Sequence, residues 1–187
     1  MINKQLIFLF FLFFSCDIVN DKIIIQNVNV IDPIDGLKKN VNVEILDNKI
    51  LYVGNLKKSN SYSKEIDGTG KYLIPGLWDT HVHFYFDQEL AKDMPELFLK
   101  FGVTSVRDTG GDFKFLDSIK KLSKENPKSY PRVKISGPLI DGKFNVYNGD
   151  RLPNLSVKTR NIKETEIVVN DLVEKGVDFL KAYEMLS

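Results

Sequence analysis

The sequence predicts an α/β fold in which a small β-rich segment precedes a series of alternating strands and helices. From Lys22 to about residue 74, the apolar residues are mostly β-branched and alternate with polar ones, as in strands that bury one face. From Pro75 onward, short apolar stretches alternate with longer amphipathic ones. Because this pattern is typical of parallel strands joined by right-handed helical crossovers, we expect the second part to form an α/β unit.

The β-rich segment divides into strands and turns. Asp32-Pro33 predicts a turn after the first strand, residues 47–49 a hairpin turn, and residues 67–70 a further turn. The polar stretch 55–64 is expected to be a loop. The strands are expected at residues 23–25 with 28–30, at 41–45, at 50–53 and at 71–74.

The second part predicts four strands, at residues 77–84, 103–108, 133–136 and 177–183, and three helices, at 89–101, 113–122 and 162–175. Gly102 and Gly176 end the first and third helices. The loop 141–161 is interpreted as a substrate lid or as an insertion. The apolar residues expected to share one side of the first helix are Leu90, Met94, Leu97 and Phe98, and those expected to be buried in the third are Ile167, Val168, Leu172 and Val173.

Residues 1–16 predict a secretory signal peptide, because Lys4 precedes an unbroken apolar stretch, 6–14, that is too short to span a bilayer. Ser15-Cys16 resembles the lipobox of bacterial lipoproteins, in which the cysteine is lipidated, although Phe13 stands where that family usually has leucine. We therefore expect an exported protein, lipid-anchored at the cell envelope through Cys16 on the periplasmic or outer surface. The alternative is plain cleavage and secretion.

Composition excludes several other classes. The chain has 26 basic and 25 acidic residues, a formal net charge of +1, and no long block of like charges, so it predicts no nucleic-acid partner. Membrane contact is expected only through the leader or its lipid. Because Cys16 is the only cysteine, an intrachain disulfide and a cysteine-based zinc site are both impossible.

The only two histidines, His81 and His83, lie two residues apart on the predicted strand 77–84. Alternate side chains of a strand share a face, so the two imidazoles are expected to point the same way and could bind one metal ion. On spacing alone, a pair of polar surface residues is the commoner explanation.

The surrounding residues resemble those of the amidohydrolase superfamily. That family has a β-rich segment, a Gly-x-Gly turn as at Gly68 and Gly70, then Pro-Gly and an Asp-x-His-x-His motif on its first barrel strand, here residues 75–83. Residues 98–108, 136–138 and 176–183 resemble the second, third and fourth barrel strands of its imidazolonepropionase-like and prolidase-like branch. The resemblance covers residues 22–187.

The resemblance implies the first half of a (β/α)8 TIM-type barrel of metal-dependent hydrolases, at residues 75–187, preceded by a β-rich domain at 17–74. It implies that His81 and His83 hold a divalent metal and that Lys181, once carboxylated, bridges to a second ion. Without the resemblance, Lys181 would be interpreted as an ordinary lysine reaching solvent. The nitrogen and oxygen donors favour zinc, one or two ions, with manganese, iron and cobalt also compatible.

Four neighbouring residues complete the expected site. Asp79 is either a carboxylate that holds a metal ligand in place or a buried polar residue of the barrel floor. Asp108 and Tyr183 lie at strand ends, where a side chain can hold a metal ligand in place or contact substrate. Arg107 is expected to form an ion pair with Asp108 that stabilises the top of the barrel.

The expected activity is hydrolysis of a C–N bond, in a dipeptide-like or cyclic amide small molecule, by metal-activated water. Two alternatives remain. One is a non-catalytic exported binding protein or gene remnant of amidohydrolase ancestry. The other is a mononuclear deaminase-type member, which would not need Lys181.

The family's site also requires two histidines and a general-base aspartate from later strands, and a complete barrel takes about 250 residues. None of these three positions occurs in the sequence. We therefore expect the chain to be the N-terminal portion of such an enzyme, inactive and unstable as a free monomer, and able to oligomerise when full length.

Overall fold

The computed structural model describes residues 22–55 and 62–186. The predicted signal peptide and Cys16 lie outside the described residues. The chain divides into two compact units, one ending at Pro75 and the other beginning at Gly76, and each is described by itself. No helix in the described ranges has the length and apolar character needed to cross a membrane.

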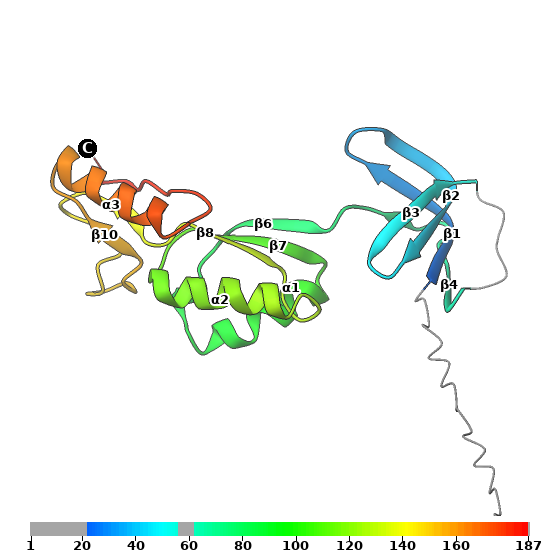
Figure 1. The fold of residues 1–187 in the computed structure, drawn as a ribbon, viewed down its shortest axis with the longest axis horizontal. Coiled ribbons are helices and arrows are strands. Elements are labelled where there is room, and N and C mark those ends of the chain that lie inside the picture. The colour runs from blue at the N-terminus through cyan, green and yellow to red at the C-terminus, as the bar shows by residue number, and fades with distance from the viewer. Residues whose placement is uncertain (1–21, 56–61, 187) are drawn as a thin grey trace, which may run out of the picture. The chain divides into compact units, whose positions relative to one another are not determined.

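The first unit is a five-stranded sheet in the order β3-β2-β1-β4, with β5 also paired to β1 (Figure 1). The first three strands form an antiparallel meander, and β4 and β5 run parallel to β1. Ile24, Val28, Val41 and Val43 are its buried apolar residues. The strands are β1 (Lys22–Asp32), β2 (Gly36–Leu46), β3 (Lys49–Gly54), β4 (Lys64–Asp67) and β5 (Tyr72–Leu73).

Strand β4 was not expected from the sequence. Its residues are largely polar and exposed, with Ile66 half-buried, because β4 lies at the edge of the sheet. Its pairing with β1 is made by backbone groups, which a polar sequence does not reveal.

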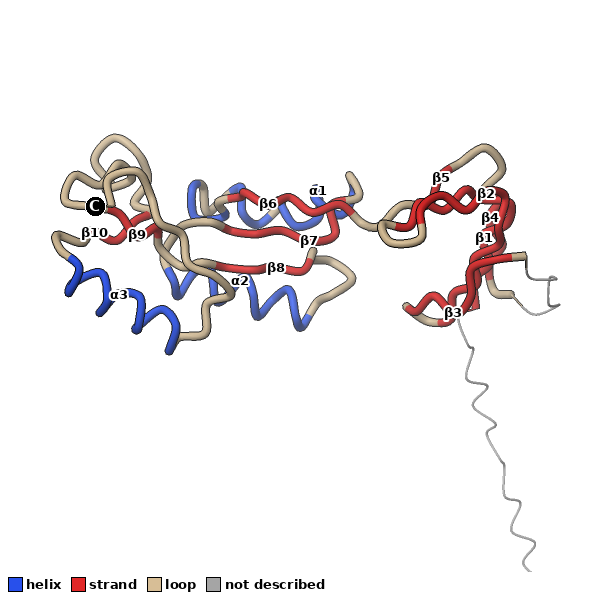
Figure 2. The backbone as a smooth tube through the Cα atoms, turned by 90° about the horizontal axis from the view of Figure 1, so that it is seen from above, coloured by secondary structure: helices blue, strands red, loops and turns tan. Residues whose placement is uncertain are grey.

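The second unit contains a parallel sheet of three strands in the order β6-β7-β8, and helices cover one of its faces (Figures 1 and 2). This arrangement confirms the α/β class. The strands are β6 (Leu77–Val82), β7 (Val103–Asp108) and β8 (Arg132–Ile135), and the helices are α1 (Met94–Lys100) and α2 (Phe113–Glu125), preceded by the short turns η1 (Phe84–Phe86) and η2 (Leu90–Lys92). The buried apolar cluster between sheet and helices is formed by Val82, Phe84, Ala91, Val106, Leu116, Ile119, Val133 and Ile135.

The first predicted helix of this unit begins later than expected. Residues 90–92 form a 3-10 turn, and α1 starts at Met94 with Pro95 in its first turn. A proline lacks the N–H that a helix interior needs, so it marks a helix start rather than the middle of a helix. Met94 and Phe98 pack on the buried cluster, but Leu90 and Leu97 are exposed, so only half of the predicted apolar side is correct.

The remainder of the unit holds a two-stranded parallel sheet, β9 (Leu139–Asp141) with β10 (Ser156–Lys158), and helix α3 (Ile162–Glu174). The predicted loop is therefore the segment 142–155 between two paired strands. In α3, Leu172 is buried as expected, whereas Ile167 and Val173 are 61% and 59% exposed, contrary to the prediction.

The prediction of a strand at residues 177–183 is wrong, because this segment does not form a regular strand. The segment is extended, but its backbone bonds are shared between two neighbours: Asp178 N–H donates to Ile135, and Lys181 accepts from Ile140, both at 2.8 Å. A single bridge joins Ile140 and Ala182. Because β8 and β9 are separated by a break at Gly137, where φ is +71°, no continuous ladder can form along this segment.

Candidate metal centre

A β-bulge sets the positions of the two histidines. Asp79 pairs with Val106 and Val82 pairs with Asp108, so β6 has one residue more than β7 between these points. The Asp79 carboxylate accepts the His81 backbone N–H at 3.1 Å. The bulge thus interrupts the strict alternation of side chains that the sequence predicts. A bulge changes the direction in which a side chain points, and bulges are common near functional sites. Asp79 supports the His81 backbone.

The imidazoles of His81 and His83 converge. Their Nε2 atoms are 3.2 Å apart, and their rings meet edge to face with centroids 5.1 Å apart. Two nitrogens about 2.0–2.1 Å from one tetrahedral ion would lie roughly 3.3–3.4 Å apart. The pair therefore fits the spacing of two ligands on one ion, and metal binding by these residues stays a prediction.

The second ring nitrogen of His83 has a partner that suits a metal ligand. His83 Nδ1 lies 3.2 Å from the Gly110 carbonyl oxygen, which can only accept. Nδ1 therefore carries the proton, and Nε2 keeps its lone pair directed toward His81. Burial lowers the pKa of His83, the Gly110 carbonyl opposes this, and the charges of His81 and Lys181 lower it further. The environment thus favours neutral imidazole, the form that binds metals.

Asp108 is fully buried at the end of β7. Its Oδ2 accepts the Phe84 N–H at 2.6 Å, and its Oδ1 accepts the Gly110 N–H at 3.0 Å. Burial raises the pKa of Asp108 to about 7, although both N–H groups act in the opposite direction. The side chain has no exposed surface. Its hydrogen bonds are with the backbone N–H of Phe84, next to His83, and of Gly110, whose carbonyl faces the His83 ring.

Lys181 follows α3 on the extended segment and is half-buried. Its positive charge is the last of the influences that lower the pKa of His83. Two residues later, Tyr183 packs its ring edge on Tyr147, with centroids 5.6 Å apart, and burial is the first cause that raises the pKa of its hydroxyl.

Arg107 does not pair with Asp108, contrary to the prediction. Its guanidinium lies over the Phe179 ring, 4.7 Å from the centroid. Neighbouring side chains of a strand point to opposite faces, so Arg107 is exposed while Asp108 is buried under the helices.

The described donor set is therefore small. Within residues 22–55 and 62–186, no three His, Cys, Asp or Glu side chains gather around a point that could hold a metal. The two histidines are the described side chains whose spacing fits a metal ion, and a ligand role for a carboxylated Lys181 stays a prediction. Reasoning from the sequence missed the Gly110 carbonyl. The signal for it was Asp108-Thr109-Gly110, because an aspartate commonly accepts the N–H two residues later.

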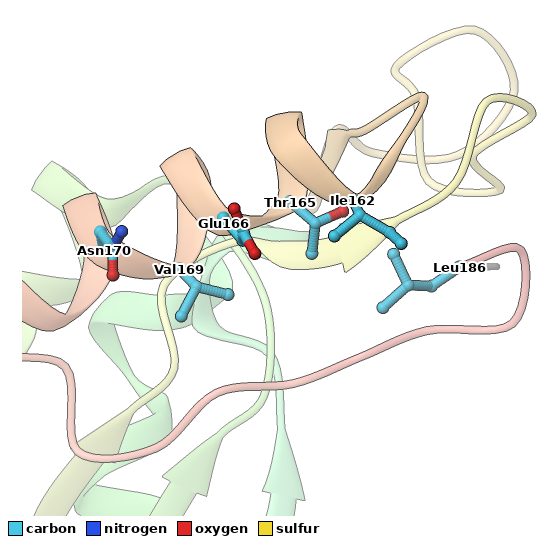
Figure 3. A pocket seen from close by; sticks show the side chains of 6 residues that line it. All are labelled: Ile162, Thr165, Glu166, Val169, Asn170 and Leu186. Atoms are coloured by element: carbon cyan, nitrogen blue, oxygen red, sulfur yellow. The ribbon is translucent and has the colours of Figure 1, made fainter.

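A separate pocket of about 360 Å³ runs along α3 and includes none of these residues (Figure 3). It is lined by Ile162, Thr165, Glu166, Val169, Asn170 and Leu186. With Glu166 as its only ionisable group, it lacks the donors of a metal site, so the histidine pair is the candidate centre.

No protein-family model matches the chain. Among curated proteins, the dihydroorotase of Clostridioides difficile strain 630 is 44% identical over 62 residues, which cover 33% of this chain and 15% of that protein. The adenine deaminase of Clostridium perfringens strain ATCC 13124 is 36% identical over 88 residues, which cover 46% of this chain and 15% of that protein.

Among solved structures, a Xaa-Pro dipeptidase with bound methionine in its active site matches with a TM-score of 0.71 at 21% identity. The match covers 86% of this chain and 46% of the dipeptidase, so the chain spans about half the length of that structure. The dipeptidase shows that the fold is shared, and the two curated hydrolases show local sequence relationship. These similarities, each over part of the chain or at the level of the fold, agree with the resemblance to the amidohydrolase superfamily seen in the sequence.

Proposed function

We propose that the full-length protein is a metal-dependent amidohydrolase that hydrolyses C–N bonds with metal-activated water. The observation that carries this proposal is the convergence of His81 and His83, with Nε2 atoms 3.2 Å apart and the His83 Nδ1 facing a carbonyl oxygen. A surface pair of histidines would need neither the convergence nor the buried partner.

The roles of the chain's residues follow from this geometry. His81 and His83 would hold one divalent ion, and Lys181, carboxylated, would supply an oxygen ligand for a second. Bound there, such an ion lowers the pKa of water and polarises the carbonyl to be attacked. Zinc is the ion that we expect, on the basis of the nitrogen and oxygen donors.

The proposed substrate is a small amide, either dipeptide-like or cyclic. Support comes from the names of similar proteins, a dihydroorotase among the curated relatives and a Xaa-Pro dipeptidase among the solved structures. A mononuclear deaminase is the second candidate, supported by the relationship to an adenine deaminase. The two candidates differ in their need for Lys181, because a mononuclear site does not use that lysine.

We also propose that residues 75–187 supply the first four strands of a barrel and that export through residues 1–16 places the enzyme in the cell envelope. In support, β6, β7 and β8 are parallel and joined through α1 and α2. Lipidation at Cys16 and closure of the barrel are part of this proposal.

The test uses full-length protein purified with its metal. We expect His81→Ala and His83→Ala to lose bound metal and to lose hydrolysis of Xaa-Pro and cyclic amide substrates. The loss of metal affinity should exceed the roughly 10–100-fold that results from changing a residue that only supports a ligand. Lys128, an exposed residue of the turn that follows α2, supplies the control variant, Lys128→Ala, which should keep both. Undiminished metal content in both histidine variants would contradict the proposal.

Lys181→Ala separates the two candidates. In a binuclear amidohydrolase it should remove one equivalent of metal and most activity. A variant that keeps its metal content, and deaminates a purine base as fast as the unmodified protein, would favour the deaminase instead.

A further inference from the structure

We propose that Asp108 is a positioning residue of the metal centre, which orients the His83 imidazole through the backbone at Phe84 and Gly110. The inference rests on the proposed function, because it assigns the residue that prepares His83 to bind metal. Asp108 is itself neither a ligand nor a substrate contact, since none of its side chain is exposed.

The first contact fixes the backbone that leaves His83. Asp108 Oδ2 accepts the Phe84 N–H at 2.6 Å, a short bond of the kind that a carboxylate makes. The Phe84 ring is fully buried and packs edge to face on Phe98, with centroids 6.1 Å apart. The residue after His83 is therefore held both by its backbone and by its side chain.

The second contact fixes the partner of the imidazole. Asp108 Oδ1 accepts the Gly110 N–H at 3.0 Å, and the carbonyl of the same glycine faces His83 Nδ1 at 3.2 Å. A Cβ at position 110 would lie 2.8 Å from Leu139 Cγ and 3.4 Å from His83 Cε1. The Leu139 distance is too short for a side chain, whereas the distance to His83 is an ordinary contact, so glycine at this position makes room for Leu139 beside the ring.

Together the contacts make a closed circuit of hydrogen bonds. It runs from the His83 ring to Gly110, through the Asp108 carboxylate to the Phe84 N–H, and back to the His83 backbone. The circuit joins the ends of β6 and β7. It sets the rotation of the imidazole and the nitrogen that carries the proton, which are the two properties that decide whether Nε2 can bind a metal.

The circuit requires a side chain with two oxygens that can both accept. Both partners are N–H donors, so both oxygens must accept. Asparagine would turn an NH2 group toward one of them and leave a buried N–H without an acceptor. Asp108→Asn is therefore nearly isosteric but breaks one link of the circuit.

Asp141 provides a matched control. It is also fully buried at a strand end, and its carboxylate accepts three backbone N–H groups, from Gly142, Val146 and Met185. None of these bonds leads to His83. Asp141→Asn should thus disturb folding about as much as Asp108→Asn without acting on the imidazole.

The experiment compares both variants with unmodified full-length protein by Co²⁺ titration, followed through the visible absorption of the bound ion. We expect Asp108→Asn to weaken Co²⁺ binding roughly 10–100-fold and Asp141→Asn to leave it within about threefold. Equal weakening in the two variants, or unchanged affinity in Asp108→Asn, would overturn the proposal. Unchanged Co²⁺ affinity in His83→Ala would instead contradict the proposed function, on which this inference rests.

A second measurement can be made on the unmodified protein alone, so its decisive outcome does not require the variants to fold. Nitrogen-15 NMR of the metal-free protein, labelled at histidine, reports which nitrogen of His83 is protonated. We expect Nδ1–H in unmodified protein and in Asp141→Asn, and a mixture of tautomers in Asp108→Asn. A predominant Nε2–H form in the unmodified protein would overturn the proposal.

Discussion

At the scale of single residues, the environment of His83 favours the neutral ring. Desolvation penalises the imidazolium, and the charges of His81 and Lys181 add to this penalty. The carbonyl of Gly110 is the one opposing influence. A neutral ring with Nδ1 protonated is the form in which a histidine binds a metal through Nε2.

The first prediction concerns the titration of this ring. In metal-free protein, His83 should stay neutral at a pH where an ordinary histidine is half protonated, so its midpoint should fall below 6.5. Its metal affinity should accordingly be lost only on further acidification. An NMR pH titration of the labelled ring measures the midpoint, and a value at or above 6.5 would contradict the predicted effect of burial.

At the scale of elements, Asp178 connects three parts of the second unit. Its carboxylate forms ion pairs with Lys120 of α2 at 2.7 Å and Lys134 of β8 at 2.9 Å, and it accepts the Ile135 N–H at 3.0 Å. Burial alone would raise the pKa of Asp178, but the two lysines and the N–H together hold it below the usual value. The side chain is 16% exposed, so these bonds are largely shielded from solvent.

The second prediction follows from these bonds. Asp178→Asn should destabilise the protein by about 1–3 kcal/mol, because Lys120 keeps its charge in a mostly buried position without a partner. Since the folded pKa of the carboxyl is lowered, its stabilisation is complete above the usual pKa near 3.8 and disappears as the pH falls through the folded value.

Urea unfolding of the full-length protein between pH 3 and 7 provides the measurement. The difference in unfolding free energy between unmodified protein and Asp178→Asn should be constant from about pH 5 upward and shrink toward pH 3. Asp117→Asn is the control, because its ion pair with Lys121 is on the α2 surface and its loss should cost less than about 1 kcal/mol. A difference that grows on acidification would contradict the proposed role of Asp178.

At the scale of the whole molecule, the second unit exposes several large apolar side chains. On β6, Leu77 and Trp78 are 49% and 47% exposed, and on α3 Ile162 and Ile167 are 73% and 61% exposed. Within the described residues, β6 pairs only with β7, so one edge of the sheet is open. Exposed apolar surface beside an open edge favours association with other chains.

The third prediction concerns the 187-residue chain produced by itself. We expect it to associate or to unfold without a cooperative transition, and to show no hydrolase activity, whereas the full-length protein should unfold cooperatively and be active. Size-exclusion chromatography, urea unfolding and the amide hydrolysis assay make the comparison. An active, cooperatively folded monomer of this chain would contradict the prediction.

Several features could be predicted from the sequence because they depend on local pattern. Strict alternation in residues 41–45 gave the position of β2, and the β-branched run of 103–108 coincides with β7. Gly102 and Gly176, which take φ of +80° and +76°, follow α1 and α3 as expected. The His81-x-His83 spacing and its neighbours were enough to indicate the family, because those residues are consecutive in the chain.

Other features were decided by contacts between segments that are distant in the chain. The bulge in β6 depends on the register of β6 with β7. The extended segment that carries Lys181 forms backbone hydrogen bonds first with β8 and then with β9, and Gly137 lies between these two strands. The orientation of His83 depends on the carbonyl of Gly110, which lies 27 residues away along the chain. Residue types and spacing, which are local, thus predicted the elements and the histidine pair. Register, burial and backbone partners bring remote segments together, so the tertiary structure alone determined how that pair is held.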